Sequence, residues 1–202
     1  TEKQGRDVVS WVDKILAIFP QEAAFYQRCG ADVAFVGHPC TDIVRPYRDK
    51  RRAENIVALF PGSRRQEIER LLPLFLKAMR GWCHQNKLTP VVSCASAQYE
   101  PLIQELIATH GDADISCFTG ASLDLMAKAR VSLVSSGTIS LEHALMGVPH
   151  VVTYRFNPMT YWLARTFFKK TLAKIPFMSM PNMLSQAEVF PELLQGQVIV
   201  PN

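Results

Sequence analysis

The alternation of apolar runs and amphipathic segments from Ile56 onward is the feature that most constrains the fold. Residues 56–60 form a continuous apolar run, typical of a strand buried on both faces. Further strands are predicted at residues 90–94, 115–118, 131–134 and 150–154, with helices at 99–109, 122–128 and 138–146. The helix predicted directly after the strand at 56–60 carries one apolar stripe at helical spacing, made of Ile68, Leu71, Leu72, Phe75, Leu76 and Met79. This order predicts an α/β fold with a parallel sheet covered by helices on both faces.

The residues before Ile56 follow a different pattern. An apolar stretch at 15–19, a helix at 22–29 and a strand at 33–36 are predicted there. Residues 40–54 are rich in charge around Pro46, which is typical of a linker. The basic residues of this run could bind a phosphate, but a solvated linker is the favoured interpretation.

Composition argues against several classes of protein. The net charge of +4 is mild, and suits anionic small molecules or a membrane surface at least as well as nucleic acid. The five cysteines are scattered without a C-x-x-C pair, so we expect buried thiols in a reducing cytoplasm rather than disulfides or a zinc site. His143 and His150 lack an acidic partner at ligand spacing, so structural roles and no metal are predicted. No apolar run is long enough to span a bilayer.

The first candidate site residues follow the strand at 56–60. Gly62 lets the backbone approach a ligand closely, and Ser63 adds a hydroxyl donor. The helix that starts next offers free N–H groups and the positive end of its dipole, which suit phosphate. Arg64 can place two N–H groups on phosphate oxygens. For this motif alone, an ordinary tight turn with a solvated arginine is an equal alternative.

A second turn of the same kind follows the strand at 131–134. Ser136, Gly137 and Thr138 are small, two of them carry hydroxyls, and a helix begins at once. Glu142 lies one turn into that helix, where a carboxylate can accept two hydrogen bonds from a ribose diol. Taken alone, Glu142 is better explained as a first-turn acid that helps to cap the helix.

Both turns follow predicted parallel strands, and open parallel sheets bind ligands at the carboxyl ends of their strands. Neither turn is a G-x-x-x-x-G-K-[ST] loop or a G-x-G-x-x-G turn, which disfavours P-loop hydrolysis of ATP or GTP and a simple dehydrogenase. Two phosphate-type turns with an acid in the second helix fit a nucleoside diphosphate that carries a sugar. No further cofactor is predicted.

An ordered set of motifs runs through the whole chain. The motifs are F-V-G-H-P at 35–39, P-G-S-R at 61–64, S-G-T with L-E at 136–142, Y-R at 154–155, N-P-M-T-Y-W-L-A at 157–164, P-N at 181–182 and V-F-P-E-L-L-Q at 189–195. This set resembles the lipid-A-disaccharide synthase family of inverting glycosyltransferases. The resemblance implies a two-domain GT-B fold with a Rossmann-like sheet. Residues 1–39 would end the N-terminal acceptor-binding domain, 40–55 would be the linker, and 56–202 would belong to the C-terminal UDP-sugar-binding domain.

The resemblance also implies an activity for the parent protein. The family transfers a diacylated glucosamine from UDP onto the 6-hydroxyl of a diacylated glucosamine 1-phosphate. The products are a β-1,6-linked tetraacyl disaccharide phosphate and UDP. The implied place is the cytoplasm of a Gram-negative bacterium, peripheral on the inner face of the inner membrane. Both ends of the chain look cut, so we expect a fragment that is inactive alone. No nucleic-acid partner is expected, and a homo-oligomer stays open.

Roles follow from the resemblance where the motifs match. The implied UDP-sugar-binding residues are Gly62, Ser63, Arg64, Ser136, Gly137, Thr138, Glu142 and Asn182. Among them, Arg64 would stabilise the charge that builds on departing UDP. Glu142 would bind the ribose, and Asn182 would lie at the donor site. The general base is expected to be a carboxylate of the N-terminal domain, outside this chain.

Some positions depart from the family or allow two interpretations. Gln186-Ala187 stands where a Gly-Arg pair is usual, and Cys40 where an aliphatic residue is common. His38 could contact substrate or pack at a hinge. The aromatic and basic segment 161–174 could dock on anionic lipid or pack with snorkelling lysines. A helix start is also predicted at Pro191-Glu192.

Two other functions stay open. One is a different UDP-sugar transferase or epimerase on the same architecture, against which the motifs at 157–164 and 181–182 argue. The other is a non-catalytic nucleotide-binding module, which UDP binding without turnover would support.

Overall fold

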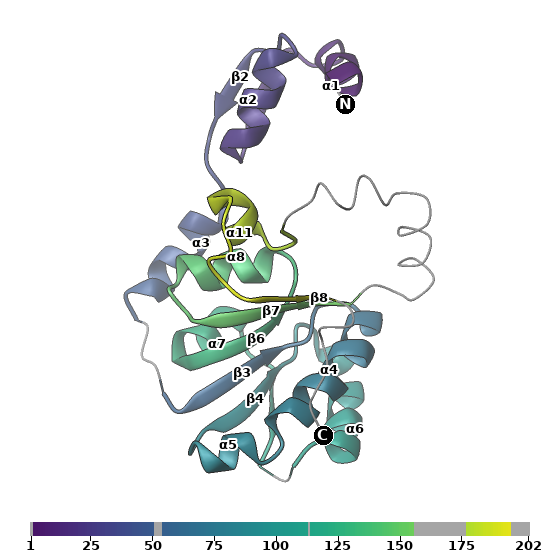
Figure 1. The fold of residues 1–202 in the computed structure, drawn as a ribbon, viewed down its shortest axis with the longest axis vertical. Helices are drawn as coiled ribbons and strands as arrows, with labels where there is room; N and C mark the ends of the chain where they lie inside the picture. The colour runs from purple at the N-terminus through teal and green to yellow at the C-terminus, as the bar shows by residue number, and fades with distance from the viewer. Residues whose placement is uncertain (1, 51–53, 113, 156–176, 195–202) are drawn as a thin grey trace. The chain divides into compact units, whose positions relative to one another are not determined.

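The computed structural model describes residues 2–50, 54–112, 114–155 and 177–194 (Figure 1). The chain divides into two compact units, Thr1–Arg45 and Pro46–Asn202. Their boundary falls within the linker predicted at 40–55. A division of labour between an acceptor domain and a donor domain stays a prediction.

The first unit holds a small parallel sheet. Helix α1 (Glu2–Val9) is followed by β1 (Ile15–Ala17), α2 (Pro20–Arg28) and β2 (Val33–Phe35). Strands β1 and β2 pair in parallel, with Ile15 opposite Val33. The predicted helix at 22–29 and strand at 33–36 therefore form close to their expected positions, as α2 and β2.

Helix α3 (Cys40–Arg48) occupies most of the segment predicted as a linker. Composition misled there because charged residues also cover the solvent face of a helix. Cys40 and Val44 are both buried and lie one turn apart, so they give α3 an apolar stripe despite Pro46 inside it. Residues 40–48 of the predicted linker are therefore helical, and the linker itself stays a prediction.

The second unit is built on a six-stranded sheet with the order β5-β4-β3-β6-β7-β8, in which every neighbouring pair is parallel. The strands are β3 (Ile56–Phe60), β4 (Thr89–Ser93), β5 (Ser116–Phe118), β6 (Ala129–Ser135), β7 (His150–Tyr154) and β8 (Glu192–Leu194). The connecting helices are α4 (Arg65–Met79), α5 (Trp82–Gln85), the short 3-10 helix η1 (Ala97–Tyr99), α6 (Glu100–His110), α7 (Ser122–Lys128), α8 (Thr138–Leu145) and α11 (Met180–Ser185).

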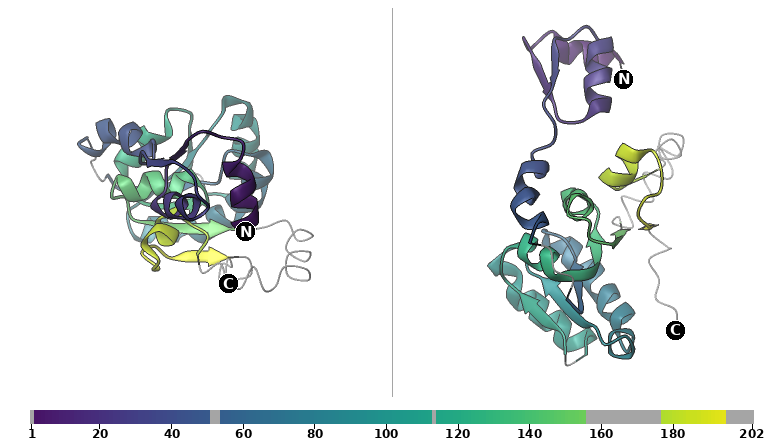
Figure 2. Two further views of the ribbon diagram at one scale, coloured as in Figure 1. Left: turned by 90° about the horizontal axis from the view of Figure 1, so that it is seen from above. Right: turned by 90° about the vertical axis from the view of Figure 1, so that its left-hand side faces the viewer.

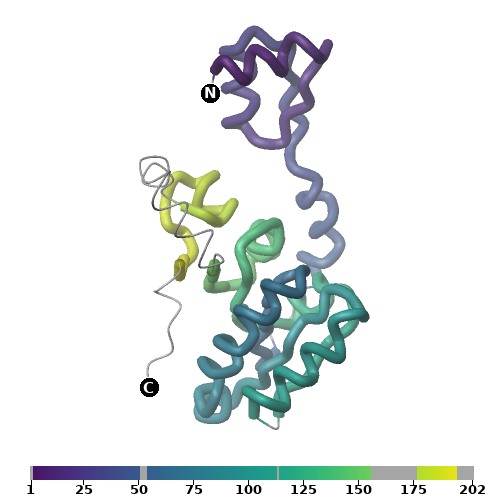
Figure 3. The backbone as a smooth tube through the Cα atoms, turned by 90° about the vertical axis from the view of Figure 1, so that its right-hand side faces the viewer, coloured from purple at the N-terminus to yellow at the C-terminus, as the bar shows by residue number. Residues whose placement is uncertain are grey.

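Helices cover both faces of this sheet, as both views of Figure 2 show. Helices α4 and α6 lie side by side on one face (Figure 3), where Val57 and Leu59 of β3 join the buried stripe of α4. Side chains of a strand alternate between faces, so Phe60 points the other way and meets His143 of α8 at a ring distance of 4.8 Å. The predicted α/β fold with a two-sided parallel sheet is confirmed.

The prediction of a helix start at Pro191-Glu192 is wrong. Residues 192–194 form the edge strand β8, which pairs in parallel with β7 from Val152 opposite Glu192. The carbonyl of Pro191 already accepts a hydrogen bond from the N–H of Val152 at 2.9 Å. Pairing with a strand distant in sequence therefore overrides a local Pro-Glu pattern that favours a helix start.

Other predictions meet the limits of the described residues. The helix predicted from Asn157 and the basic segment 161–174 lie outside them. Among the helices that the structure describes, none is long and apolar enough to cross a membrane. All five cysteines are free, with Cys40, Cys83 and Cys94 buried and Cys29 and Cys117 partly buried.

Candidate functional site

The site lies where the order of strands reverses. From β3 the chain moves to β4 and β5 on one side of the sheet, then crosses back to β6, β7 and β8 on the other. Strands β3 and β6 are therefore neighbours, with Phe60 opposite Val134 at their carboxyl ends. Open α/β sheets bind ligands in the crevice at such a reversal. The two turns that the sequence singles out both start there.

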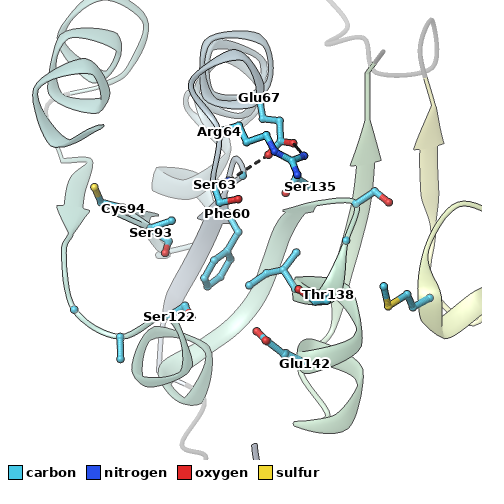
Figure 4. Close-up of a pocket in the computed structure, with 18 residues that line it drawn as sticks. Phe60, Ser63, Arg64, Glu67, Ser93, Cys94, Ser122, Ser135, Thr138 and Glu142 are labelled. Atoms are coloured by element: carbon cyan, nitrogen blue, oxygen red, sulfur yellow. Dashed lines mark hydrogen bonds and ion pairs between the residues drawn. The ribbon is translucent and has the colours of Figure 1, made fainter. Parts of the chain in front are cut away.

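A cavity of about 610 Å³ opens between these turns (Figure 4). Seven of the eight predicted donor-binding residues line it, and Asn182 does not. Figure 4 shows Ser63 and Arg64 on one side of the cavity and Thr138 and Glu142 on the other. The predicted residues it gathers are Gly62, Ser63, Arg64, Ser136, Gly137, Thr138 and Glu142.

The first turn needs its glycine. Gly62 has a φ of +119°, a conformation that residues with a Cβ rarely adopt. Helix α4 begins two residues past Ser63, so its first N–H groups and the positive end of its dipole lie at the turn. The Arg64 side chain lines the cavity and is 82% exposed.

A carboxylate already lies on this turn. Glu67 of α4 lines the cavity, and its Oε2 accepts a hydrogen bond from the N–H of Ser63 at 3.2 Å. Its Oε1 accepts one from Nη1 of Arg64 at 3.0 Å. The donors predicted to hold phosphate therefore hold an anionic side chain in this structure.

The second turn is also built around a glycine. Gly137 has a φ of +144° and occupies the N-cap position of α8, and nothing lies within 4 Å of where its Cβ would be. Thr138 follows as the first residue of the helix and is exposed to solvent. The turn therefore leaves open space in front of the amino end of α8, which suits an anion.

Ser136 lines the cavity and is hydrogen-bonded to neighbouring segments. Its N–H donates to the carbonyl of Thr153 at 3.1 Å, and its hydroxyl donates to the carbonyl of Met178 at 3.2 Å. Both donors are used within the protein and tie the second turn to β7 and to the segment that precedes α11. A phosphate contact by Ser136 stays a prediction.

Glu142 lies one turn into α8 and lines the cavity, as the sequence suggests. It is half-buried, and burial raises the pKa of its carboxyl above the ordinary value of 4.5. A partly desolvated carboxylate is a strong hydrogen-bond acceptor, so this position suits recognition of paired hydroxyl groups.

Asn182 is a structural residue in this fold. It is fully buried, and its Nδ2 donates to the carbonyl of Phe190 at 2.8 Å and to Oε1 of Glu192 at 2.7 Å. Its Oδ1 accepts from the N–H groups of Val189 at 2.8 Å and Phe190 at 3.0 Å. All hydrogen-bonding groups of this amide are used within the protein, and its place at the donor site stays a prediction.

Glu192 completes this network. Its carboxylate also accepts from the N–H of Met178 at 2.8 Å, and from both the N–H and the hydroxyl of Ser179 at 3.0 and 2.6 Å. Burial acts to raise the pKa of Glu192, but these hydrogen bonds outweigh it and hold that pKa below the ordinary value. The network thereby fixes the segment that brings Met180 to the cavity wall.

Sequence reasoning missed several cavity residues. Two short segments that follow β4 and β5 supply part of the lining, and both lie at the same sheet edge as the two turns. Their position after predicted strands was the signal that could have found them, although their side chains are small and carry no charge. The missed residues are Phe60, Glu67, Ser93, Cys94, Ala95, Gly120, Ala121, Ser122, Ser135, Ile139 and Met180.

His143 and His150 pack against each other inside the second unit. Both are buried, with ring centroids 5.2 Å apart. In the first unit, Nδ1 of His38 accepts from the N–H of Cys40 at 3.1 Å, and its ring lies 5.2 Å from that of Phe19. Within the described ranges, no group of three or more His, Cys, Asp and Glu side chains could hold a metal ion.

The sheet and its cavity define a doubly wound α/β domain with a cavity at the reversal of strand order. Residues 2–200 match the family described as lipid-A-disaccharide synthetase. The chain belongs to this family.

Curated relatives carry the name lipid-A-disaccharide synthase. That of Azotobacter vinelandii is 40% identical over 92% of this chain and 50% of its own length. That of Alcanivorax borkumensis is 38% identical over 97% of this chain and 53% of its own length. The Synechocystis protein is 34% identical over 100% of this chain and 53% of its own. The chain thus spans about half the length of these relatives.

Among solved structures, a putative UDP-N-acetylglucosamine 2-epimerase from Listeria monocytogenes matches with a TM-score of 0.46 and 16% identity. The match covers 70% of this chain and 42% of that one.

Proposed function

We propose that this chain is the UDP-sugar-binding half of a glycosyltransferase of lipid A biosynthesis. The whole enzyme would transfer diacylglucosamine from UDP to the 6-hydroxyl of diacylglucosamine 1-phosphate, forming a β-1,6 bond and releasing UDP. The observation that carries the proposal is the meeting of two glycine turns and Glu142 around one cavity, in a chain of this family.

The diphosphate is assigned to the two turns. The N–H of Ser63, the guanidinium of Arg64 and the amino end of α4 supply donors from one side. Gly137, Thr138 and the amino end of α8 supply them from the other. When the glycosidic bond breaks, negative charge grows on the β-phosphate, and Arg64 would stabilise that charge because its fork of N–H groups is fixed and permanently positive.

The nucleoside is assigned to the side of the cavity formed by α8. The Glu142 carboxylate would accept hydrogen bonds from the two ribose hydroxyls, which orients the nucleoside while the turns hold its phosphates. A general base for the acceptor hydroxyl is expected in the part of the longer relatives that this chain does not span.

A titration of the 202-residue chain with UDP tests the donor site. Arg64→Ala should weaken UDP binding roughly 10- to 100-fold, because a charge-assisted hydrogen bond contributes about 1.5–3 kcal/mol. Glu142→Ala should weaken it roughly tenfold. Arg65→Ala is the matched control, since Arg65 pairs with Glu69 and does not line the cavity. Unchanged UDP affinity in both site variants would refute the assignment.

Release of UDP by the full-length parent, with both lipid substrates present, tests the reaction.

The enzyme is proposed to work peripherally at the cytoplasmic face of the inner membrane, where its acylated substrates reside. The basic segment 161–174 supports this proposal through its composition. Reversing the charge of Lys169 and Lys170 should reduce sedimentation of the protein with anionic vesicles. Equal sedimentation of variant and wild type would remove this part of the proposal.

A further inference from the structure

The carboxylate of Glu67 lies against three residues of the first turn, Gly62, Ser63 and Arg64. Glu67 accepts a hydrogen bond from the N–H of Ser63 at 3.2 Å and from Nη1 of Arg64 at 3.0 Å. It also lies over Gly62, because a Cβ added to that glycine would collide with the Glu67 carboxylate. Figure 4 shows Glu67 beside Arg64 and Ser63 at the edge of the cavity.

These contacts use the donors that the proposed function assigns to a diphosphate. A carboxylate resembles a phosphate in presenting two anionic oxygens to the same N–H groups. Arg64 carries five N–H groups and can serve two acceptors, but Ser63 has one backbone N–H. Two anions side by side on one turn would also repel each other. Glu67 and a phosphate group therefore compete for Ser63.

Ordinary helix capping does not account for this geometry. In a capping box, the third residue of a helix returns to the N–H of the N-cap residue. Arg64 is the N-cap of α4 and Glu67 its third residue, but the Glu67 carboxylate reaches one residue further, to Ser63 in the cavity wall. The neighbouring pair of Arg65 and Glu69, 2.7 Å apart, lies outside the cavity and serves as a comparison.

We propose that Glu67 is an internal anion that occupies the diphosphate position while the site is empty and leaves Ser63 when the donor binds. The inference rests on the proposed function of the cavity. The Glu67 side chain is 31% exposed and that of Arg64 is 82% exposed, so both side chains can rotate toward solvent. Displacing Glu67 is a cost that every diphosphate ligand meets on binding. Glu67 thereby lowers the affinity for the donor and for the UDP product alike.

The test compares Glu67→Gln with the wild-type chain by calorimetric titration. Glutamine keeps the length and an acceptor oxygen for Ser63, and removes the charge that competes with phosphate. UDP should bind about three- to tenfold more tightly to this variant, the range expected for loss of one exposed ion pair and its repulsion. Uridine, which has no phosphate, should bind as it does to wild type. Glu69→Gln removes the same charge two residues along α4 and should change neither affinity.

The outcomes separate this inference from the proposed function. If wild type binds UDP and Glu67→Gln binds it equally or less tightly, Glu67 is not a competitor and the inference fails alone. If uridine gains as much as UDP, the effect does not involve phosphate, and the inference fails too. If neither protein binds UDP, the proposed function fails, and the inference fails with it.

A crystal structure of the wild-type chain with UDP gives a second measurement that needs no variant. The Glu67 carboxylate should then lie beyond hydrogen-bond reach of the Ser63 N–H, with a phosphate oxygen in its place. A carboxylate still bound to Ser63 beside an ordered diphosphate would overturn the inference.

Discussion

Two buried histidines link Phe60, which lines the cavity, to Phe190 just before the edge strand β8. The rings of Phe60, His143, His150 and Phe190 follow one another at centroid distances of 4.8, 5.2 and 4.0 Å. Nδ1 of His143 donates to the carbonyl of Ile139 at 2.7 Å, which leaves Nε2 as the unprotonated nitrogen, with no partner among the described residues. Burial lowers the pKa of His143 to about 3, so the ring is neutral in the folded state.

This neutral ring makes stability depend on pH. Between pH 6.5 and about 3 the unfolded chain takes up a proton that the folded chain refuses, so the unfolding free energy falls as the pH falls. The contribution of His143 should reach up to about 1.4 kcal/mol per pH unit within that window. His143→Leu should flatten the dependence in urea titrations from pH 7 to pH 4, whereas replacing the exposed His84 with Gln should leave it unchanged. An unaltered slope in His143→Leu would contradict this account.

Glu142 shows the opposite sign. Because its pKa is raised, the folded chain keeps the carboxyl proton at pH values where the unfolded chain has lost it. Stability should therefore fall as the pH rises from 4.5 through the raised pKa, and charged Glu142 should destabilise the fold at neutral pH. Glu142→Gln should raise the melting temperature at pH 7, and less so at pH 4, while it weakens UDP binding. A lower melting temperature at pH 7 would count against this sign.

At the scale of elements, residues 178–192, from just before α11 to the start of β8, are held together by a few polar side chains. Glu192 and Asn182 satisfy backbone groups on both sides of α11, and Ser136 binds the carbonyl of Met178 from the second turn. The wall of the cavity next to Met180 therefore depends on an edge strand of three residues.

Glu192→Gln should destabilise the chain by about 1–3 kcal/mol, because its amide nitrogen replaces one of the two oxygens that accept from the N–H groups of Met178 and Ser179, and cannot accept there. Urea unfolding at pH 7 measures this cost. Glu188→Gln, at an exposed position in the same segment, is the matched control and should change stability by less than about 0.5 kcal/mol. Equal stability of the two variants would show that the network contributes little.

These elements show what could be predicted from the sequence. Strand β3 and helix α4 follow from local patterns, since a strand buried on both faces is apolar throughout and a helix that packs on a sheet has one apolar stripe. Strand β8 does not, because its pairing with β7 depends on residues distant in the chain. Its Pro191-Glu192 start matches the local pattern of a helix.

The same contrast holds for the site. Residue type and spacing alone single out Gly62 and Arg64 of the first turn and Gly137 of the second, and these residues line one cavity. The partner of the Ser136 hydroxyl could not be predicted, because a side chain 42 residues away from its acceptor has no signal in local sequence. Glu67 lies at helical spacing from Ser63, but an acidic residue beside a predicted phosphate-binding turn runs against charge complementarity, so the sequence does not predict its hydrogen bond to Ser63.

At the scale of the whole molecule, the two units differ in how much apolar surface they bury. Trp11, Leu16 and Phe35 of the first unit are 81%, 63% and 56% exposed, and its sheet has two strands. A two-stranded sheet is marginal in water, whereas the second unit surrounds a six-stranded sheet with a continuous core. Their local stabilities should therefore differ.

Hydrogen exchange followed by mass spectrometry should reveal this difference. Amides of β1 and β2 should exchange at least about 100-fold faster than those of β3, β4 and β6, since opening a small unit costs less free energy than opening the sheet. Peptides from α4 and α6 provide an internal reference for a packed helix pair. Similar protection of β1 and β3 would show that the first unit is as stable as the second.

The position of β3 beside β6 has a consequence for the order of folding. The two glycine turns become neighbours only when β6, which follows β4 and β5 in the chain, pairs with β3. Such non-local pairing forms slowly, because the entropy of closing a long loop must be overcome first. A nucleotide that needs both turns can bind only molecules in which β6 has already paired with β3. Such a nucleotide would slow unfolding without accelerating the first steps of folding. The onset of nucleotide binding during refolding would therefore mark the pairing of β3 with β6.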